Sequence, residues 1–345
     1  MKFFYMVISL CLTIPLFGVE KIVWRDVARD ADFAVEGCFK TPGTPAFQRL
    51  PENGEFSKLN RIHGRNSAGI QVRFRSDSKK VRVRVKLESS GTMCHIPATG
   101  QSGIDLYIGT PGQERYVDTT IFDPAKPGYE VELLDAQKAK MRDFTLNLPL
   151  FNTVLALEIG LIPGAVVRPP IKRPAGKIVF YGTSITQGGC ASRPGMCHTN
   201  ILSRRLGREI LNFGFSGSGT LDLPVAVLLA KIPDPVLYVI ECEANCSNEV
   251  LCVRLRPFVA ALRTAHPSVP ILLVSALPSK NTNDVADRFQ RDFVRQSNDR
   301  NLHFLDGRSL LGDNPGECTV DNLHLTTLGF QRYAEALEKT IKGLL

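Results

Sequence analysis

Apolar and polar residues alternate in several short segments through the first half of the chain. The alternation covers Ile70–Arg75, Val81–Leu87, Ile104–Ile108, Tyr129–Leu133 and Phe144–Leu148. Glycine, proline and asparagine separate these segments, and a period of two residues puts the apolar side chains on one face of a strand. The pattern therefore predicts a half-buried antiparallel β-sandwich over residues 20–170.

The rhythm changes after residue 170, where apolar runs of strand length alternate with segments of helical length. The predicted strands are Ile178–Tyr181, Glu209–Phe213, Val236–Cys242, Ile271–Ala276 and Leu302–Leu305. The predicted helices are Thr199–Leu206, Leu223–Lys231, Glu249–Ala265, Asp284–Asn298 and Thr327–Leu344. Strands that alternate with helices favour right-handed crossovers, so residues 171–345 are predicted to form an α/β domain with a parallel five-stranded sheet. Four prolines within Pro163–Pro174 interrupt both patterns and place the domain boundary near Pro170.

The N-terminal segment Met1–Val19 has the order of a signal peptide. Lys2 precedes an apolar core, and Gly18 is a small residue suited to a cleavage site. Cys11 follows Leu10 rather than a small residue, which favours release over lipid anchoring. No later apolar run is long enough to cross a bilayer. We therefore expect a secreted or periplasmic protein without stable membrane insertion.

The composition is that of a globular protein, with 43% hydrophobic and 22% charged residues among 345. The net charge of +8 is not concentrated in a tail, and no clustered basic patch with stacking aromatics predicts nucleic-acid binding. The side chains between the apolar positions of two predicted strands are basic: Arg73, Arg75, Arg82, Arg84 and Lys86. They fit either a contact surface for an anionic glycan or the solvated face of a sandwich, and the second interpretation is favoured.

Eight cysteines remain after the predicted signal peptide: 38, 94, 190, 197, 242, 246, 252 and 318. An even count in an exported chain permits disulfides, and Cys190–Cys197 and Cys246–Cys252 are close enough in sequence to close small loops. Buried free thiols are an equally good interpretation. No paired Cys-x-x-Cys or histidine spacing predicts a zinc site.

Polar groups follow the predicted strands of the second domain at their carboxyl ends, where open α/β sheets bind ligands. Ser184 follows the first strand, and a glycine-rich run that includes Gly217 follows the second. Asn245 follows the third, and the loop after the last strand carries Asp321 and His324. Acyl transfer needs a nucleophile, a base, a group that orients the base and donors for an oxyanion. These positions supply all four.

This set resembles the SGNH, or GDSL-like, hydrolase superfamily, whose four blocks match Gly182-Thr-Ser184, Gly217, Asn245 and Asp321-x-x-His324. The longer segment from Gly182 to Gly195 is similar to a bacterial subgroup that carries an N-terminal jelly-roll domain and includes esterases and carbohydrate deacetylases. The resemblance implies a flavodoxin-like hydrolase domain behind an all-β jelly-roll sandwich.

The resemblance also implies the role of each residue. Ser184 is the expected nucleophile, His324 its base and Asp321 the group that orients the histidine. The backbone N–H groups of Ser184 and Gly217 and the side chain of Asn245 are the expected oxyanion hole. No metal or organic cofactor is required.

Two residues depart from the family pattern. Thr183 stands where the family usually has aspartate, and we expect little effect because that residue transfers no proton. Glu243 precedes Asn245 by two residues, and its carboxylate would oppose a developing oxyanion unless it points away or is paired.

The best-supported function is an exported esterase that removes short acyl groups, acetyl foremost, from a polysaccharide. The alternatives are a lipid or lysophospholipid acyl hydrolase and a catalytically impaired glycan-binding protein. The polar, turn-rich segment after Gly189 favours a sugar over a lipid substrate. Arg193 in that segment is a candidate substrate contact, and a structural salt bridge is an equal alternative. The remaining histidines, 63, 95, 198, 266 and 303, are predicted to be surface or packing residues.

Overall fold

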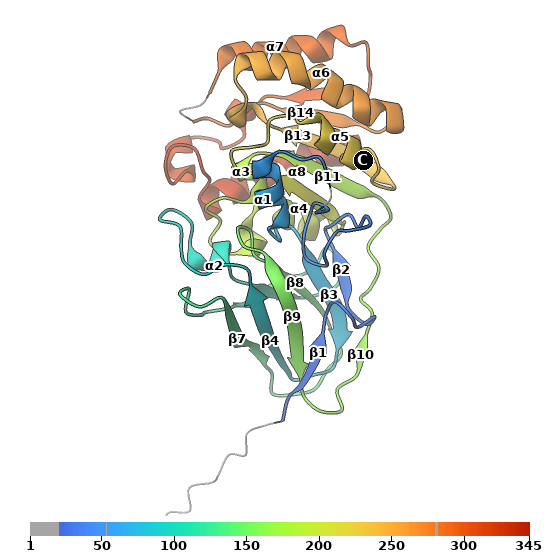
Figure 1. Ribbon diagram of the computed structural model, residues 1–345, viewed down its shortest axis with the longest axis vertical. Coiled ribbons are helices and arrows are strands. Elements are labelled where there is room, and N and C mark those ends of the chain that lie inside the picture. Colours follow the sequence, from blue (N-terminus) through green and yellow to red (C-terminus); the bar gives the residue numbers. More distant parts are fainter. Residues whose placement is uncertain (1–20, 53, 280–281) are drawn as a thin grey trace, which may run out of the picture.

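The computed structural model describes residues 21–52, 54–279 and 282–345 (Figure 1). The predicted signal peptide, Met1–Val19, lies outside these residues. The β-rich region forms one end of the molecule and the α/β region forms the other (Figure 1). No helix in the described part of the chain is long and apolar enough to span a membrane.

The β-rich region is built from two antiparallel sheets that face one another. The first has the strand order β1 (Val23–Asp26), β9 (Val154–Leu161), β4 (Lys80–Leu87) and β7 (Gly128–Asp135). The second has the order β10 (Val167–Arg168), β3 (Gln71–Ser76), β8 (Arg142–Asn147), β5 (Asp105–Ile108) and β6 (Arg115–Thr119), and β2 (Ala34–Glu36) pairs with β3. Alternate residues of both sheets, such as Phe74 on β3 and Val83 on β4, form one shared core. The sandwich predicted from the period of two is confirmed.

The prediction of a uniformly solvated basic face is wrong for Arg73. Its side chain is 2% exposed and pairs with Glu36 at 2.8 Å. The segment after β10 covers this side chain, because Arg73 also donates a hydrogen bond to the Ile171 carbonyl oxygen at 2.9 Å. By contrast, Arg84 and Lys86 on β4 are exposed, as expected.

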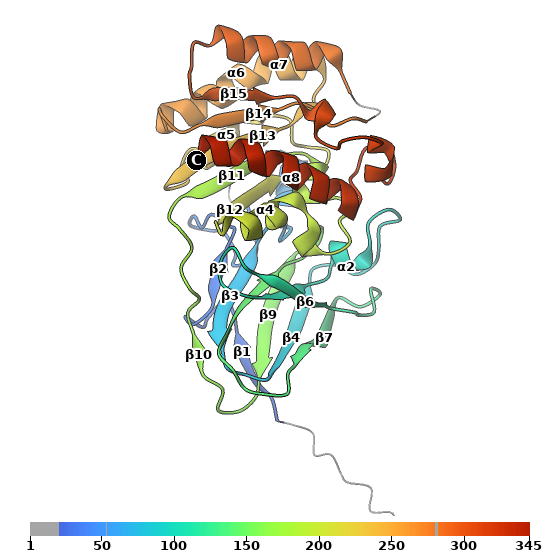
Figure 2. The ribbon, with the colours of Figure 1, turned by 180° about the vertical axis from the view of Figure 1, so that it is seen from behind.

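The second region contains a five-stranded parallel sheet, which confirms the predicted α/β fold. The strand order is β12 (Ile210–Gly214), β11 (Lys177–Gly182), β13 (Pro235–Glu241), β14 (Ile271–Val274) and β15 (Leu302–Leu305). Apolar side chains alternate between its two faces, and each face has its own core. On one face lie α5 (Leu223–Leu229), α6 (Asn248–Ala265) and α7 (Asp284–Gln296). The other face is covered by α4 (His198–Leu206) and α8 (Thr327–Leu344), which cross in front of the sheet in Figure 2.

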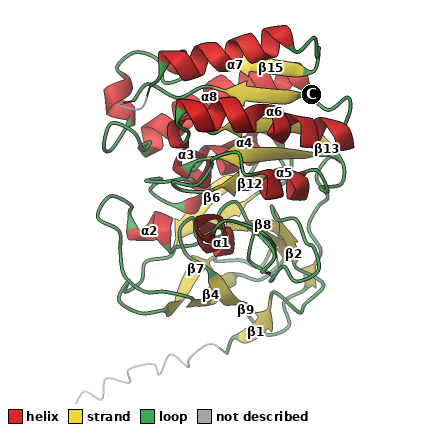
Figure 3. Ribbon diagram, turned by 45° about the horizontal axis from the view of Figure 1, so that its top comes forward, coloured by secondary structure: helices red, strands yellow, loops and turns green. Residues whose placement is uncertain are grey.

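The two regions pack closely against one another. Part of the described segment between β2 and β3 packs against the α/β region, and its helix α1 (Lys58–Arg65) lies between the two regions in Figure 3. Leu50 and Phe56 from this segment belong to the core on the α5–α7 face of the parallel sheet. The short helices α2 (Ala98–Gln101) and α3 (Ser184–Gln187) also lie at the junction. Residues 169–176 connect β10 to β11 without helix or strand.

Candidate active site

Ser184 is the first residue of α3 and follows strand β11, which ends at Gly182, after the single residue Thr183. Thr183 caps this helix, because its side-chain oxygen accepts a hydrogen bond from the Ile185 N–H at 3.2 Å. A Cβ at Gly182 would lie 2.4 Å from the Glu241 carbonyl oxygen, so the sharp exit from the strand requires glycine there. The serine is thus held at the carboxyl edge of the sheet by a tight strand-to-helix turn.

The structure brings Ser184, His324 and Asp321 into one hydrogen-bonded chain. The Ser184 Oγ lies 2.9 Å from His324 Nε2, and His324 Nδ1 lies 2.9 Å from Asp321 Oδ2. The second Asp321 oxygen accepts the His324 backbone N–H at 2.8 Å. Because one carboxylate holds both the backbone and the ring of the histidine, the imidazole has little freedom to rotate. Its Nδ1 carries the proton toward Asp321, which leaves the Nε2 lone pair for the serine.

Two of the three predicted oxyanion donors, Gly217 and Asn245, follow the two strands that flank β11. Gly217 follows β12, has a φ of +67°, and no heavy atom lies within 4 Å of where its Cβ would be. Asn245 follows β13, and its Oδ1 accepts the Gly219 N–H at 3.3 Å. Because the oxygen end of the amide is engaged, the NH₂ end of Asn245 is the donor that remains for a ligand.

The carboxylate of Glu243, which could oppose a negative charge near these donors, is held by other hydrogen bonds. Its Oε2 accepts hydrogen bonds from the Ala276 N–H at 3.1 Å and from the Gln290 side chain at 2.7 Å. Both partners belong to the β14–α7 side of the domain, and burial raises the pKa of the Glu243 carboxyl. The Glu243 carboxylate is therefore paired with hydrogen-bond donors, which is one of the two conditions under which we expect it not to oppose the oxyanion.

Glu241 is a buried residue of this site that the sequence did not single out. Its Oε2 accepts hydrogen bonds from the hydroxyls of Thr183 at 2.9 Å and Thr186 at 3.0 Å, which lie one residue before and two residues after Ser184. Burial raises the pKa of Glu241 to about 7. Thr183, in the position usually held by aspartate, therefore connects the nucleophile turn to a buried carboxyl on β13.

The glycine-rich loop is braced from the N-terminal region. Arg49 is 1% exposed and donates to the carbonyl oxygens of Asn212 at 3.0 Å and Gly214 at 2.6 Å. Gln187 of α3 accepts the Ser216 N–H at 2.9 Å and donates to the Leu150 carbonyl oxygen at 3.0 Å. The loop that carries Gly217 is thus fixed by residues far away in sequence.

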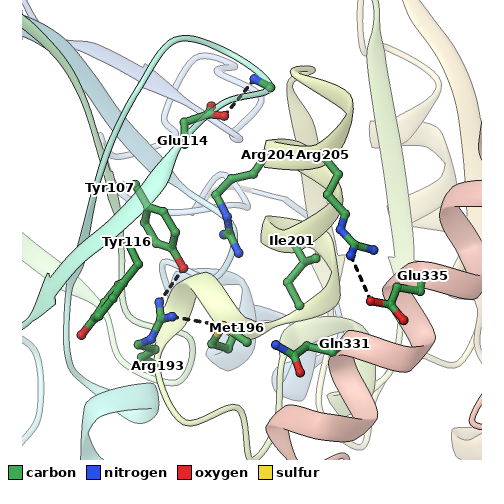
Figure 4. A pocket seen from close by; sticks show the side chains of 11 residues that line it. Tyr107, Glu114, Tyr116, Arg193, Met196, Ile201, Arg204, Arg205, Gln331 and Glu335 are labelled. Carbon is green, nitrogen blue, oxygen red and sulfur yellow. Dashed lines mark hydrogen bonds and ion pairs between the residues drawn. The ribbon is translucent and has the colours of Figure 1, made fainter.

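Asp105 and Tyr107 of the sandwich hold the loop that follows Ser184 and α3. Asp105 accepts Arg193 at 2.8 Å and the Gly195 N–H at 2.7 Å, and Tyr107 contacts the same guanidinium. Arg193 also lies over the Tyr116 ring, 3.8 Å from its centroid. It borders a pocket of about 340 Å³ between β5, β6, α4 and α8 (Figure 4). This pairing matches the salt-bridge alternative, and the substrate contact by Arg193 stays a prediction.

His95 is a second site residue that the sequence missed, because it was assigned to surface or packing. It lies on the loop between β4 and α2, and its ring centroid is 5.4 Å from that of His324. Nothing local in the sequence marks it, since the contact joins two domains. Cys190 lies beside both histidines and, with them, could hold a metal ion.

The eight cysteines of the described residues are all free thiols. The predicted pairs Cys190–Cys197 and Cys246–Cys252 are therefore wrong, and the alternative of free thiols is correct. Cys197 is fully buried beside Thr199, with its Sγ 3.4 Å from that hydroxyl, and it packs as a small apolar residue. Burial raises the pKa of Cys190 to about 12, so its thiol stays protonated at neutral pH.

Comparison with known families agrees with this geometry. Residues 175–342 match the model of the GDSL-like lipase/acylhydrolase family, and residues 22–167 match the N-terminal region of SGNH-hydrolase-type esterases. The second model bears the motif name GxDLY, and the chain reads Gly103-Ile-Asp-Leu-Tyr107, the strand that holds Arg193. No protein with a curated description matches the chain.

Solved structures share the whole architecture. A Bacteroides ovatus protein described as a GDSL-like lipase is 28% identical, with a TM-score of 0.86, over 94% of this chain and 98% of that one. A salicylyl-acyltransferase from a tetracycline biosynthetic pathway is 19% identical, with a TM-score of 0.74 over the same shares. A family two carbohydrate esterase from Cellvibrio japonicus is 13% identical, with a TM-score of 0.63, again over 94% and 98%. The last two similarities concern the fold alone.

The family models together cover almost all of the described chain, and the blocks that define the hydrolase stand at its strand ends. The chain belongs to the GDSL-like, or SGNH, family of carboxylic ester hydrolases and carries the N-terminal domain of SGNH-hydrolase-type esterases.

Proposed function

We propose that this protein is an exported serine esterase that removes short acyl groups, acetyl foremost, from a polysaccharide. The observation that carries the proposal is the hydrogen-bonded chain from Ser184 through His324 to Asp321. A serine, a histidine and a carboxylate in this order are the groups that acyl transfer to water requires.

The reaction proceeds in two steps. His324 accepts the Ser184 hydroxyl proton while Oγ attacks the ester carbonyl, and it then gives that proton to the leaving alcohol. Water attacks the resulting acyl-serine, with His324 again as base, and the acid departs. Asp321 keeps the imidazole in the tautomer that has a free Nε2 and stabilises the imidazolium that forms in each step.

The negative charge of the tetrahedral intermediate is carried by the former carbonyl oxygen. Its donors are the backbone N–H groups of Ser184 and Gly217 and the Asn245 amide. The bracing by Arg49 and Gln187 supports this assignment, because donors that are fixed beforehand need no reorganisation as charge develops.

The polar surroundings support a small acyl group on a hydrophilic carrier. Ser192 and Thr327 form a hydroxyl pair at 2.8 Å, and Thr99 donates to the Ser192 carbonyl oxygen at 2.6 Å. Ser192 belongs to the same loop as Gly189, whose Cβ position would lie 3.2 Å from the His324 ring. A long acyl chain would need an apolar channel in its place. Export follows from the signal-like segment Met1–Val19.

The experiment is acetate release from a panel of acetylated polysaccharides, with an acyl-length series of p-nitrophenyl esters and a lysophospholipid as comparison. We expect acetate release from at least one polysaccharide, and kcat/KM values that fall steeply beyond short acyl chains. Preference for long acyl chains or for the lysophospholipid would contradict the substrate assignment. Binding of a polysaccharide without hydrolysis of any ester would contradict the function itself.

A further inference from the structure

Three side chains with strong metal-binding groups converge beside the nucleophile. One ligand atom each from His95, Cys190 and His324 lies within 4.8 Å of the other two. They come from three separate segments: the β4–α2 loop of the sandwich, the loop after α3, and the loop before α8. The esterase mechanism uses only His324, so the other two have no assigned role.

We propose that His95, Cys190 and His324 bind a Zn²⁺-class transition-metal ion, and that the bound ion reversibly inhibits the enzyme. The inhibition rests on the proposed role of His324 as the base, whereas the metal site itself does not. Such a site would let the availability of a metal in the surroundings control the activity of the esterase.

The chemistry of the three ligands selects the metal. Two imidazole nitrogens and one sulfur suit zinc and its neighbours, and they do not suit Mg²⁺ or Ca²⁺, which prefer oxygen. Zinc bonds of about 2.0–2.3 Å imply ligand atoms about 3.5 Å apart in a tetrahedral site, so the cluster has to contract by roughly 1 Å. His95 is half-buried on a loop and can supply that movement, while Cys190 is buried and His324 is fixed by Asp321. Three protein ligands leave the fourth position for water.

A metal ion at this site would inhibit the enzyme because it would occupy the lone pair that His324 needs as a base. The Nδ1 proton of His324 is directed to Asp321, so the ring has one free pair, on Nε2. This is the pair that accepts the Ser184 hydroxyl, 2.9 Å away. A metal ion bound there leaves the serine without a base. Binding also displaces the Cys190 thiol proton to solvent, and a chelator that removes the ion lets the thiol take up a proton again.

The first test is the absorption spectrum of tag-free, full-length protein titrated with Co²⁺, a spectroscopic substitute for Zn²⁺. We expect a thiolate-to-cobalt charge-transfer band that disappears in Cys190→Ser and Cys190→Ala and weakens in His95→Gln. Cys252→Ser and His303→Gln, which change the same residue types outside the cluster, should keep the band. Absence of the band in wild-type protein, or its persistence in the Cys190 variants, would overturn the proposal. This readout needs no activity, so it decides the metal site even if the esterase function fails.

The second test is inhibition of p-nitrophenyl acetate hydrolysis by Zn²⁺, with reversal by EDTA. His95→Gln and Cys190→Ser should each raise the inhibitory Zn²⁺ concentration at least tenfold, since even outer-shell changes cost about 10–100-fold in metal affinity. The two control variants should match wild-type protein. Equal sensitivity of all five proteins would mean that zinc acts elsewhere, which would overturn the inhibitory site.

Discussion

The guanidinium of Arg49 donates a hydrogen bond to the carbonyl oxygen of Gly214 at 2.6 Å, and this contact joins the N-terminal region to the end of β12, just before the loop that carries Gly217. The same side chain also bonds to the carbonyl oxygens of Asn212, Asn66 and His63. Burial lowers the pKa of Arg49 to about 9, so the protein keeps a costly buried cation at this place. The N-terminal region therefore does more than cover the hydrolase domain: it also holds the strand end that leads into the loop with Gly217.

Replacing Arg49 should damage both stability and catalysis. Arg49→Met removes the guanidinium donor from the buried carbonyl oxygens of Asn212 and Gly214, and an unsatisfied buried polar group costs about 1–3 kcal/mol. We expect a clear fall in the midpoint of urea unfolding and, in the protein that remains folded, a lower kcat with a KM close to that of wild type. Arg61→Met, an exposed arginine of the same segment, is the control and should change neither. A folded Arg49→Met variant with wild-type kcat would show that the hydrogen bonds of Arg49 do not contribute to catalysis.

Replacement of Asn245 tests its predicted role as a donor in the oxyanion hole. Removing one such donor in a hydrolase costs about a hundredfold to a thousandfold in kcat. We expect Asn245→Ala to show a loss of that size with little change in KM, because the donor acts mainly on the transition state. The measurement is steady-state kinetics on p-nitrophenyl acetate. A loss confined to KM would assign Asn245 to substrate binding instead.

Replacement of Glu243 tests whether its carboxylate affects the stabilisation of the oxyanion. Because Gln290 and the Ala276 N–H hold this side chain, Glu243→Gln keeps the acceptor at Oε and should leave kcat within about twofold of wild type. If its charge did oppose the oxyanion, removal of that charge would raise kcat about tenfold for each 1.36 kcal/mol of relieved repulsion. A rise of that order would contradict the paired geometry.

Glu241 should make stability depend on pH. Burial raises the pKa of this carboxyl from 4.5 to about 7, so the folded state retains a proton that the unfolded state has already lost. The favourable contribution is complete below pH 4.5 and disappears as the pH rises to about 7, a change of about 3 kcal/mol. Glu241→Gln, which keeps an acceptor for Thr183 and Thr186, should lack this decline. Urea unfolding of both proteins between pH 4 and 8 is the measurement, and parallel curves would contradict it.

The fold could be predicted from the sequence because it rests on local patterns. Period two marks β3, β4 and β8, and the alternation of apolar runs with helices marks the parallel sheet. That Ser184 and His324 lie close together could be predicted because each follows an element that the pattern places, whereas their catalytic roles stay predictions. Strands such as β9, whose residues are almost all apolar, lack the alternation and were not predicted.

The remaining features depend on contacts between distant segments, which no local pattern contains. Arg73 has the spacing of an exposed strand residue, but it is buried because Glu36 and the segment after β10 cover it. His95 lies about 230 positions before His324, and only the packing of the sandwich against the hydrolase domain brings the two rings together. The predicted disulfides failed for a related reason, since closeness in sequence does not bring two Sγ atoms to bonding distance.

Hydrolysis of p-nitrophenyl acetate by Ser184→Ala is the most direct test of the proposed mechanism. Ser268→Ala, which removes an exposed hydroxyl from the turn before β14, serves as the matched control. The proposed mechanism predicts a loss of kcat of about a millionfold in Ser184→Ala, with unfolding unchanged, and full activity in Ser268→Ala. Wild-type turnover by folded Ser184→Ala would contradict the assignment of Ser184 as the nucleophile.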